Sequence, residues 1–136
     1  MDAVCVVIAG IVRSALLADQ FTLAWEHSVE KTRWEERYRV VANRLELTQA
    51  RVQGFGAGME PAAGAVLDNG WWQWNPKREP LAELKLAFSA YAGDYRLCWR
   101  DRCSELTDLL GAPPTDGEAV EVRPCATDPP SDQQRR

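Results

Sequence analysis

The feature that most constrains this chain is the alternation of large apolar and polar side chains from Phe21 onward. In FTLAWE, Phe21, Leu23 and Trp25 fall on one side and the residues between them on the other. WEERYRVV repeats the pattern and places on one side Trp34, Glu36, Tyr38 and Val40. A period of two residues is the signature of a half-buried strand. A helix through residues 34–52 is the main rival because Glu and Arg are good helix formers, but the aromatic and β-branched content favours strands.

Further strand and turn signals follow along the chain. LELTQARV reads as a third strand, and Asp68-Asn69-Gly70 supplies the positive-φ residues of a tight hairpin turn. LKLAFS and DYRLCW read as later strands, with a turn at Arg100-Asp101 and a single helical turn in TDLLG that stops at Gly111. About six to eight short strands predict an all-β fold, a small antiparallel sandwich or partly open barrel with a disordered C-terminal tail.

The two ends of the chain differ in composition from its middle. At 136 residues the size predicts one domain, which we place at residues 19–111. Residues 1–18 hold the apolar run AVCVVIAGIV and are interpreted as a degenerate export signal or N-terminal anchor, the alternative being an ordinary buried segment. Residues 112–136 carry five of the eight prolines and almost no large apolar side chains, which predicts a disordered Pro-rich tail.

The charge distribution argues against one class of partner. The net charge is −4, from 16 basic and 20 acidic side chains mixed along the chain. No long basic stripe is available to neutralise a phosphate backbone, so nucleic acid is not expected as a partner. The arginines between residues 33 and 51 are interleaved with glutamates, which predicts paired charges on a solvated face.

Four cysteines are present. Cys98 and Cys103 flank the predicted turn and would face each other as a pair whose close Cα atoms can accept a disulfide. Such a bond indicates an oxidising compartment. Zinc is the less favoured reading because the spacing is not C-x-x-C and His27 is the one histidine, so we predict no metal and no cofactor. Cys5 and Cys125 lie outside the expected core, and no role is assigned to them.

The histidine lies in HSVEKTRWEE beside a serine and several glutamates. His27 could act as a base, with Ser28 as nucleophile and an orienting carboxylate from Glu30, Glu35 or Glu60. Neighbouring residues on a strand point to opposite faces, however, and no G-x-S-x-G elbow occurs. We therefore assign no catalytic residue and favour a histidine that is hydrogen-bonded at a strand end.

A glycine-rich stretch and a tryptophan cluster are the other two features. GFGAGMEP lacks the G-x-G-x-x-G spacing of a dinucleotide site and predicts a tight loop. In WWQW, we expect Trp72 on one face and both Trp71 and Trp74 on the other. Each face would then carry a large aromatic side chain, and an exposed one suits a protein partner, a membrane interface or a stacked ligand. Core packing is an equally open reading.

The segments FTLAWEHSVEKTRWEE, ARVQGFGAGMEP, GAVLDNGWW and LCWRDRC together resemble a bacterial family. Its members are small, mostly exported domains of unknown function whose genes commonly accompany TRAP transporters of the TAXI type. The resemblance covers residues 21–110, with HSVE and GAGMEP as its specific parts. It implies a small β-rich domain at or outside the cytoplasmic membrane that is associated with solute uptake.

From this resemblance we expect a non-enzymatic periplasmic accessory domain that binds a transporter component, either the permease or the solute-binding protein, or the solute. Its location would be the periplasm or the outer face of the cytoplasmic membrane, with membrane proximity through the N-terminal segment. The alternative is a small hydrolase or metal-dependent enzyme centred on His27, Glu30 and Glu60. The residues expected to bind are His27, Ser28, Glu30, Gly56, Gly58, Glu60, Trp71 and Trp72.

Overall fold

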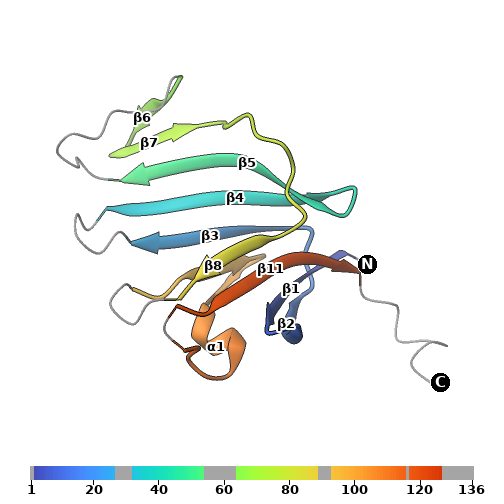
Figure 1. The fold of residues 1–136 in the computed structure, drawn as a ribbon. Coiled ribbons are helices and arrows are strands. Elements are labelled where there is room, and N and C mark those ends of the chain that lie inside the picture. Colours follow the sequence, from blue (N-terminus) through green and yellow to red (C-terminus); the bar gives the residue numbers. More distant parts are fainter. Residues whose placement is uncertain (1, 27–31, 54–63, 89–92, 116, 127–136) are drawn as a thin grey trace.

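Two antiparallel sheets form the protein in a computed structural model, which describes residues 2–26, 32–53, 64–88, 93–115 and 117–126 (Figure 1). One sheet has seven strands in the order β10-β9-β3-β4-β5-β7-β6, and the other has four in the order β2-β1-β11-β8. Neither sheet closes into a barrel. The predicted all-β fold is thus confirmed as an open sandwich.

The seven-stranded sheet contains the strands that alternation predicts. Its central strands are β3 (Gln20–Glu26), β4 (Arg33–Val41) and β5 (Arg44–Gln53). The flanking strands are β6 (Val66–Asp68), β7 (Trp71–Trp74), β9 (Arg96–Trp99) and β10 (Arg102–Glu105). The predicted turn between β6 and β7 is present, with Asn69 at φ 52° and Gly70 at φ 84°. Positive φ at both central residues suits the right-handed twist of the strands that the turn joins.

The four-stranded sheet contains the chain's first strands, where an export signal or anchor was expected. It consists of β1 (Asp2–Ile8), β2 (Ile11–Leu16), β8 (Leu84–Ala87) and β11 (Ala119–Ala126). Six of the seven residues of β1 are buried. The interpretation of residues 1–18 is therefore corrected for residues 2–16, which belong to the folded domain. A strand buried on both faces is a continuous apolar run, and this is why it resembles the middle of a signal sequence.

β11 requires a second correction, because it lies within the segment predicted as a disordered tail. It pairs along its whole length with β1, from Asp2 opposite Ala126 to Ile8 opposite Val120. On its other side it pairs with β8. Val120 and Val122 have no exposed surface. The domain predicted to end at residue 111 thus extends at least to residue 126.

The core lies between the two sheets. The seven-stranded sheet contributes an inner face that includes Phe21, Leu23 and Leu97, and β1 and β11 contribute Val4, Val6, Val120 and Val122 from the facing sheet. The one helix of the described residues, α1 (Leu106–Leu110), adds Leu106 and Leu110. It is the helical turn expected in TDLLG, and it ends as predicted at Gly111 with φ 84°.

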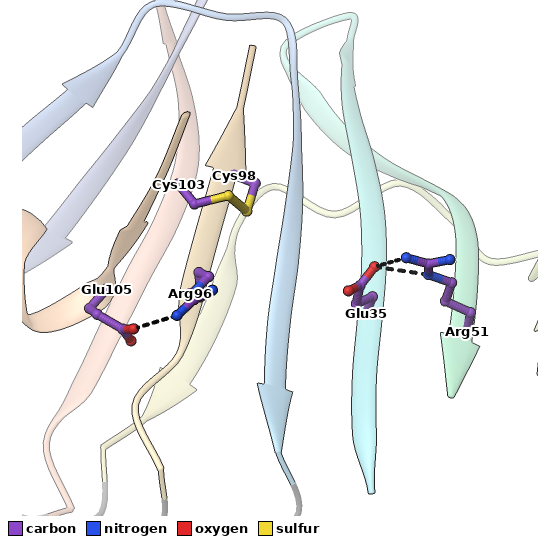
Figure 2. Close-up of a disulfide and its surroundings, with 6 residues drawn as sticks. All are labelled: Glu35, Arg51, Arg96, Cys98, Cys103 and Glu105. Atoms are coloured by element: carbon purple, nitrogen blue, oxygen red, sulfur yellow. Dashed lines mark hydrogen bonds and ion pairs between the residues drawn. A yellow bond between two sulfur atoms is a disulfide. The ribbon is translucent and has the colours of Figure 1, made fainter. Parts of the chain in front are cut away.

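The opposite, outer face of the seven-stranded sheet carries the paired charges that the sequence predicts. Arg51 binds Glu35 across β5 and β4 at 2.7 Å, and Arg39 binds Glu46 at 2.8 Å. Arg96 and Glu105 pair at 3.0 Å between β9 and β10 (Figure 2). The two more exposed pairs, Arg39–Glu46 and Arg96–Glu105, contribute about 0.2–1 kcal/mol each, so they keep the face hydrated more than they stabilise the fold.

Candidate functional site

One end of the seven-stranded sheet brings together the residues that flank both motif segments. Glu26, the last residue of β3, pairs with Arg33, the first of β4, and Arg33 pairs with Gln53, the last of β5. HSVE lies between Glu26 and Arg33, and the glycine-rich segment follows Gln53. Although residues 27–31 and 54–63 lie outside the described part, the strands that carry them end in one register row. This is the arrangement expected if the two motifs meet.

Tryptophans cover the inner face beside this row. Trp25 pairs with Trp34, Trp34 with Val52, and Val52 with Trp72. The rings of Trp25 and Trp34 stack with centroids 6.1 Å apart, and those of Trp34 and Trp74 meet edge to face at 6.5 Å. All four side chains are half-buried. We call the surface formed by Trp25, Trp34, Trp72 and Trp74 the aromatic end.

The expected distribution of the tryptophans of β7 is corrected by the register. Trp72 and Trp74 pair with Val52 and Ala50, which are both buried on the inner face, so these two tryptophans share a face. Residues two apart on a strand point the same way, and the prediction that separated them is wrong. Trp71 alone is on the outer face, where the guanidinium carbon of Arg51 lies 4.0 Å from its ring centroid.

Sequence reasoning placed Trp25 and Trp34 on an apolar side of their strands without assigning them to a site. The signal that identifies them is their position. Trp25 lies near the end of β3 and Trp34 near the start of β4, so the two tryptophans stand on either side of the HSVE segment and pair with each other. A half-buried tryptophan offers a large contact area and an N–H donor at low entropic cost, which is why tryptophan dominates many binding surfaces.

A cleft of about 280 Å³ opens beside the aromatic end. The residues that line it include Trp25, Glu26, Arg33, Asp94 and Arg96. The Asp94 Oδ2 atom accepts a 2.6 Å hydrogen bond from Thr107, whereas its Oδ1 atom is buried without a partner among the described residues. The Oγ1 atom of Thr32, next to Arg33, is also buried and has no partner in the described part of the chain. Leaving such a group unsatisfied costs about 1–3 kcal/mol, so a ligand that donates a hydrogen bond to either oxygen would stabilise the protein.

Glu36 is a carboxylate on the inner face, in the strand between Trp34 and Tyr38. The hydroxyl of Tyr38 donates a 2.7 Å hydrogen bond to its Oε1 atom. Tyr38 is 3% exposed. Burial, and secondly the hydrogen bond to Glu36, raises the pKa of Tyr38 far above its ordinary value. Tyr38 therefore keeps its proton and holds the Glu36 carboxylate in place.

This raised pKa predicts a loss of stability in alkaline solution. The unfolded tyrosine ionises near its ordinary pKa of about 10, while the folded side chain stays protonated. The free energy of unfolding should therefore show no contribution from this shift below about pH 10 and should decrease as pH rises above it. Urea unfolding at pH values on both sides of this point, for wild type and Tyr38→Phe, measures the effect. Parallel pH dependences in the two proteins would contradict it.

Several residues expected to bind lie outside the described residues: His27, Ser28, Glu30, Gly56, Gly58 and Glu60. Trp71 and Trp72 are described and lie on opposite faces of β7. Within the described residues, no group of three or more His, Cys, Asp or Glu side chains could hold a metal ion. In the same part of the chain, no helix has the length and apolar character needed to cross a membrane.

Disulfides join the four cysteines in two pairs. Cys98 and Cys103 face each other across β9 and β10, with Cα atoms 4.0 Å apart (Figure 2). Cys5 in β1 and Cys125 in β11 form the second bond, with Cα atoms 5.8 Å apart. The expectation that Cys5 and Cys125 lie outside the core is corrected, because Cys5 is 5% exposed. Their pairing depends on β1 and β11 being neighbours, which the sequence did not reveal.

Comparison with known proteins gives one match. The family model described as "Domain of unknown function (DUF1850)" matches residues 21–106. This range begins in β3 and ends at the start of α1, so it includes both motif segments, the aromatic end and the Cys98–Cys103 bond. Neither a curated protein nor a solved structure matches the chain.

Proposed function

The chain belongs to the DUF1850 family of domains of unknown function, and we propose that it is a non-enzymatic accessory domain of a TRAP solute-uptake system of the TAXI type. It acts in the periplasm or at the outer face of the cytoplasmic membrane. It binds a transporter component, the permease or the solute-binding protein, or the transported solute. The link to transport comes from the HSVE and GAGMEP resemblance, and the binding role comes from the geometry of one end of the sheet.

The observation that carries the binding role is the shared register row of Glu26, Arg33 and Gln53. These residues flank the HSVE and glycine-rich segments in the sequence and lie next to the aromatic end. A sheet end positions side chains from several strands rigidly, and the loops that leave it can vary in sequence without disturbing the core. We therefore propose that His27, Ser28, Glu30, Gly56, Gly58 and Glu60 contribute with Trp72 to one binding site.

The side chains at and beside the aromatic end are suited to non-covalent binding of a protein partner or a solute. Trp25 and Trp34 supply apolar area, and the neighbouring cleft supplies charges of both signs through Asp94, Arg33 and Arg96. The Asp94 Oδ1 atom, which has no partner within the residues that the structure describes, adds hydrogen-bonding capacity to the cleft. Binding surfaces commonly combine an aromatic centre with a polar rim in this way.

The disulfides support the proposed location. All cysteines of the described residues are paired, and disulfides form and persist in oxidising compartments such as the bacterial periplasm. Both bonds contribute to the domain itself, since one joins its first and last described strands and the other crosslinks an edge hairpin. Formation of the two disulfides therefore requires oxidation of all four cysteines.

We expect Trp34→Ala to weaken binding by about tenfold or more, the effect typical of an aromatic residue at the centre of an interface. The measurement is copurification of the full chain with the TAXI-type permease and with the solute-binding protein from detergent-solubilised membranes, together with calorimetric titration of the solute. Trp99→Ala is the matched control, because Trp99 is also a half-buried tryptophan of the same sheet but lies outside the aromatic end.

The outcomes separate the candidate ligands. Loss of permease or solute-binding-protein copurification in Trp34→Ala, with Trp99→Ala unaffected, supports a protein partner. Loss of solute affinity alone supports the solute. If wild type binds neither transporter protein nor solute, and a deletion strain transports normally, the proposal is wrong.

A further inference from the structure

The Cys98–Cys103 disulfide is accessible, in contrast to the Cys5–Cys125 bond. It lies on the outer face of the seven-stranded sheet and crosslinks β9 to β10, the strand at the sheet edge (Figure 2). Cys103 is exposed and Cys98 half-buried, whereas Cys5 is buried. A thiol in solution can therefore approach Cys103 while the protein remains folded. Thiol–disulfide exchange requires this access.

A cavity beside this bond is lined by cationic side chains. Its volume is about 320 Å³, and Cys98 lines it together with Arg37 of β4 and Arg100 of the β9–β10 turn. Arg37 is in the same register row as Cys98, with Thr22 between them. Arg100 is held in place by a 2.9 Å hydrogen bond from its Nε atom to the carbonyl oxygen of Leu17. Positive charge near a cysteine stabilises its thiolate, and a stabilised thiolate is a better leaving group.

We propose that Cys98–Cys103 is a thiol–disulfide exchange site whose redox partner is a dithiol protein, and that Cys5–Cys125 is a structural bond. A thiolate of the partner attacks the Sγ atom of Cys103 and forms a mixed disulfide. The Cys98–Cys103 bond breaks, and Cys98 leaves as a thiolate beside Arg37 and Arg100. This inference is independent of the transporter proposal.

The second step completes the transfer of two electrons from the partner to the domain. The remaining thiol of the partner attacks its own sulfur in the mixed disulfide, so that the partner becomes a disulfide and Cys103 is released. Both cysteines of the hairpin take up protons to become thiols. Two electrons and two protons pass from the dithiol to the domain, and the reverse reaction with an oxidised partner restores the bond.

The fold tolerates this reaction because the bond closes a short loop. Its cysteines are 5 residues apart, compared with 120 for Cys5 and Cys125. The stabilisation that a disulfide provides by constraining the unfolded chain increases with loop length. The Cys98–Cys103 bond therefore contributes less to the free energy of unfolding than the Cys5–Cys125 bond. The hairpin also keeps its backbone pairing and the 3.0 Å ion pair between Arg96 and Glu105.

The test uses the oxidised full chain and dithiothreitol as the probe dithiol. Samples taken during reduction under native conditions are alkylated, and the modified cysteines are quantified by peptide mass spectrometry. We expect Cys98 and Cys103 to become alkylated at least tenfold faster than Cys5 and Cys125, with the circular dichroism spectrum unchanged. Equal rates for the two pairs, or reduction only in denaturant, would overturn the proposal.

Charge variants test the role of the cavity. We expect Arg37→Gln and Arg100→Gln each to slow reduction of the hairpin bond by about threefold or more, because each removes a charge that stabilises the leaving thiolate. Arg39→Gln is the matched control, since Arg39 is on the same strand and outer face but pairs with Glu46. Rates that match this control in both cavity variants would show that accessibility alone governs the reaction, and the proposed role of the guanidinium groups would be abandoned.

Discussion

A chain shortened to end at Gly111 is expected to lose cooperative unfolding. It lacks β11, which lies between β1 and β8 in the four-stranded sheet. The shortened chain also lacks Val120 and Val122 of the core. Val4 and Val6 of β1 therefore lose their partners in β11. Burial of the two valines alone contributes about 3–6 kcal/mol, which is a large fraction of the total stability of about 5–15 kcal/mol that a domain of this size has. Urea unfolding followed by circular dichroism, together with dispersion of amide resonances, measures it.

The control for this truncation is a chain that ends at Ala126. It keeps every strand described and both disulfides, so we expect a cooperative transition close to that of the full chain. If the chain that ends at Gly111 unfolds cooperatively with similar stability, then β11 is not an integral strand and the domain boundary lies where the sequence suggested.

Removing the Cys5–Cys125 bond by the double substitution to alanine should lower the free energy of unfolding by about 5 kcal/mol. The bond spans a sequence separation of 120, and the loop-closure relation gives about this value for a loop of that length. Alanine is the appropriate substitute because the site at Cys5 is buried and a serine hydroxyl there would lack a partner. Chemical denaturation at constant temperature measures the difference.

The matched control is Cys98→Ala with Cys103→Ala. Its sequence separation of 5 corresponds to a loss of about 2 kcal/mol by the same relation. The first double variant should therefore be clearly the less stable of the two. A reversed order would mean that native-state packing around the hairpin bond outweighs the constraint on the unfolded chain.

The strands of the seven-stranded sheet were predictable because each has one buried face. In β3, Phe21 and Leu23 are buried while Glu26 is exposed, and β5 shows the same alternation through Leu45 and Leu47. The turn residues Asn69 and Gly70 identified the β6–β7 hairpin through their tolerance of positive φ. Local pattern and tertiary environment agree in this part of the chain.

The four-stranded sheet was not predictable by the same reasoning. β1 is buried on both faces, so its sequence has no alternation to distinguish it from a short apolar signal. In β11 the inward residues are Val120, Val122 and Pro124, and the proline content of the segment suggested a disordered tail. Pairing of β1 with β11 joins distant parts of the chain, and no local pattern carries that information.

The candidate site was predictable in part. The position of both motifs at strand ends follows from alternation, and the register of Glu26, Arg33 and Gln53 shows that those ends adjoin. The aromatic end depends on the register in which β3, β4, β5 and β7 pair. That register cannot be read from the sequence of any one strand. Trp34 becomes a neighbour of both Trp25 and Trp74 only once that register is set.

The pairing of β1 with β11 also sets the timing of folding during synthesis. Cys5 emerges first and Cys125 follows at a sequence separation of 120, which at about 5–20 residues per second is a delay of roughly 6–24 s. For that interval the nascent chain cannot close its smaller sheet or form its long-range crosslink. The domain reaches its native shape only after β11, the last strand of the described residues, has been made.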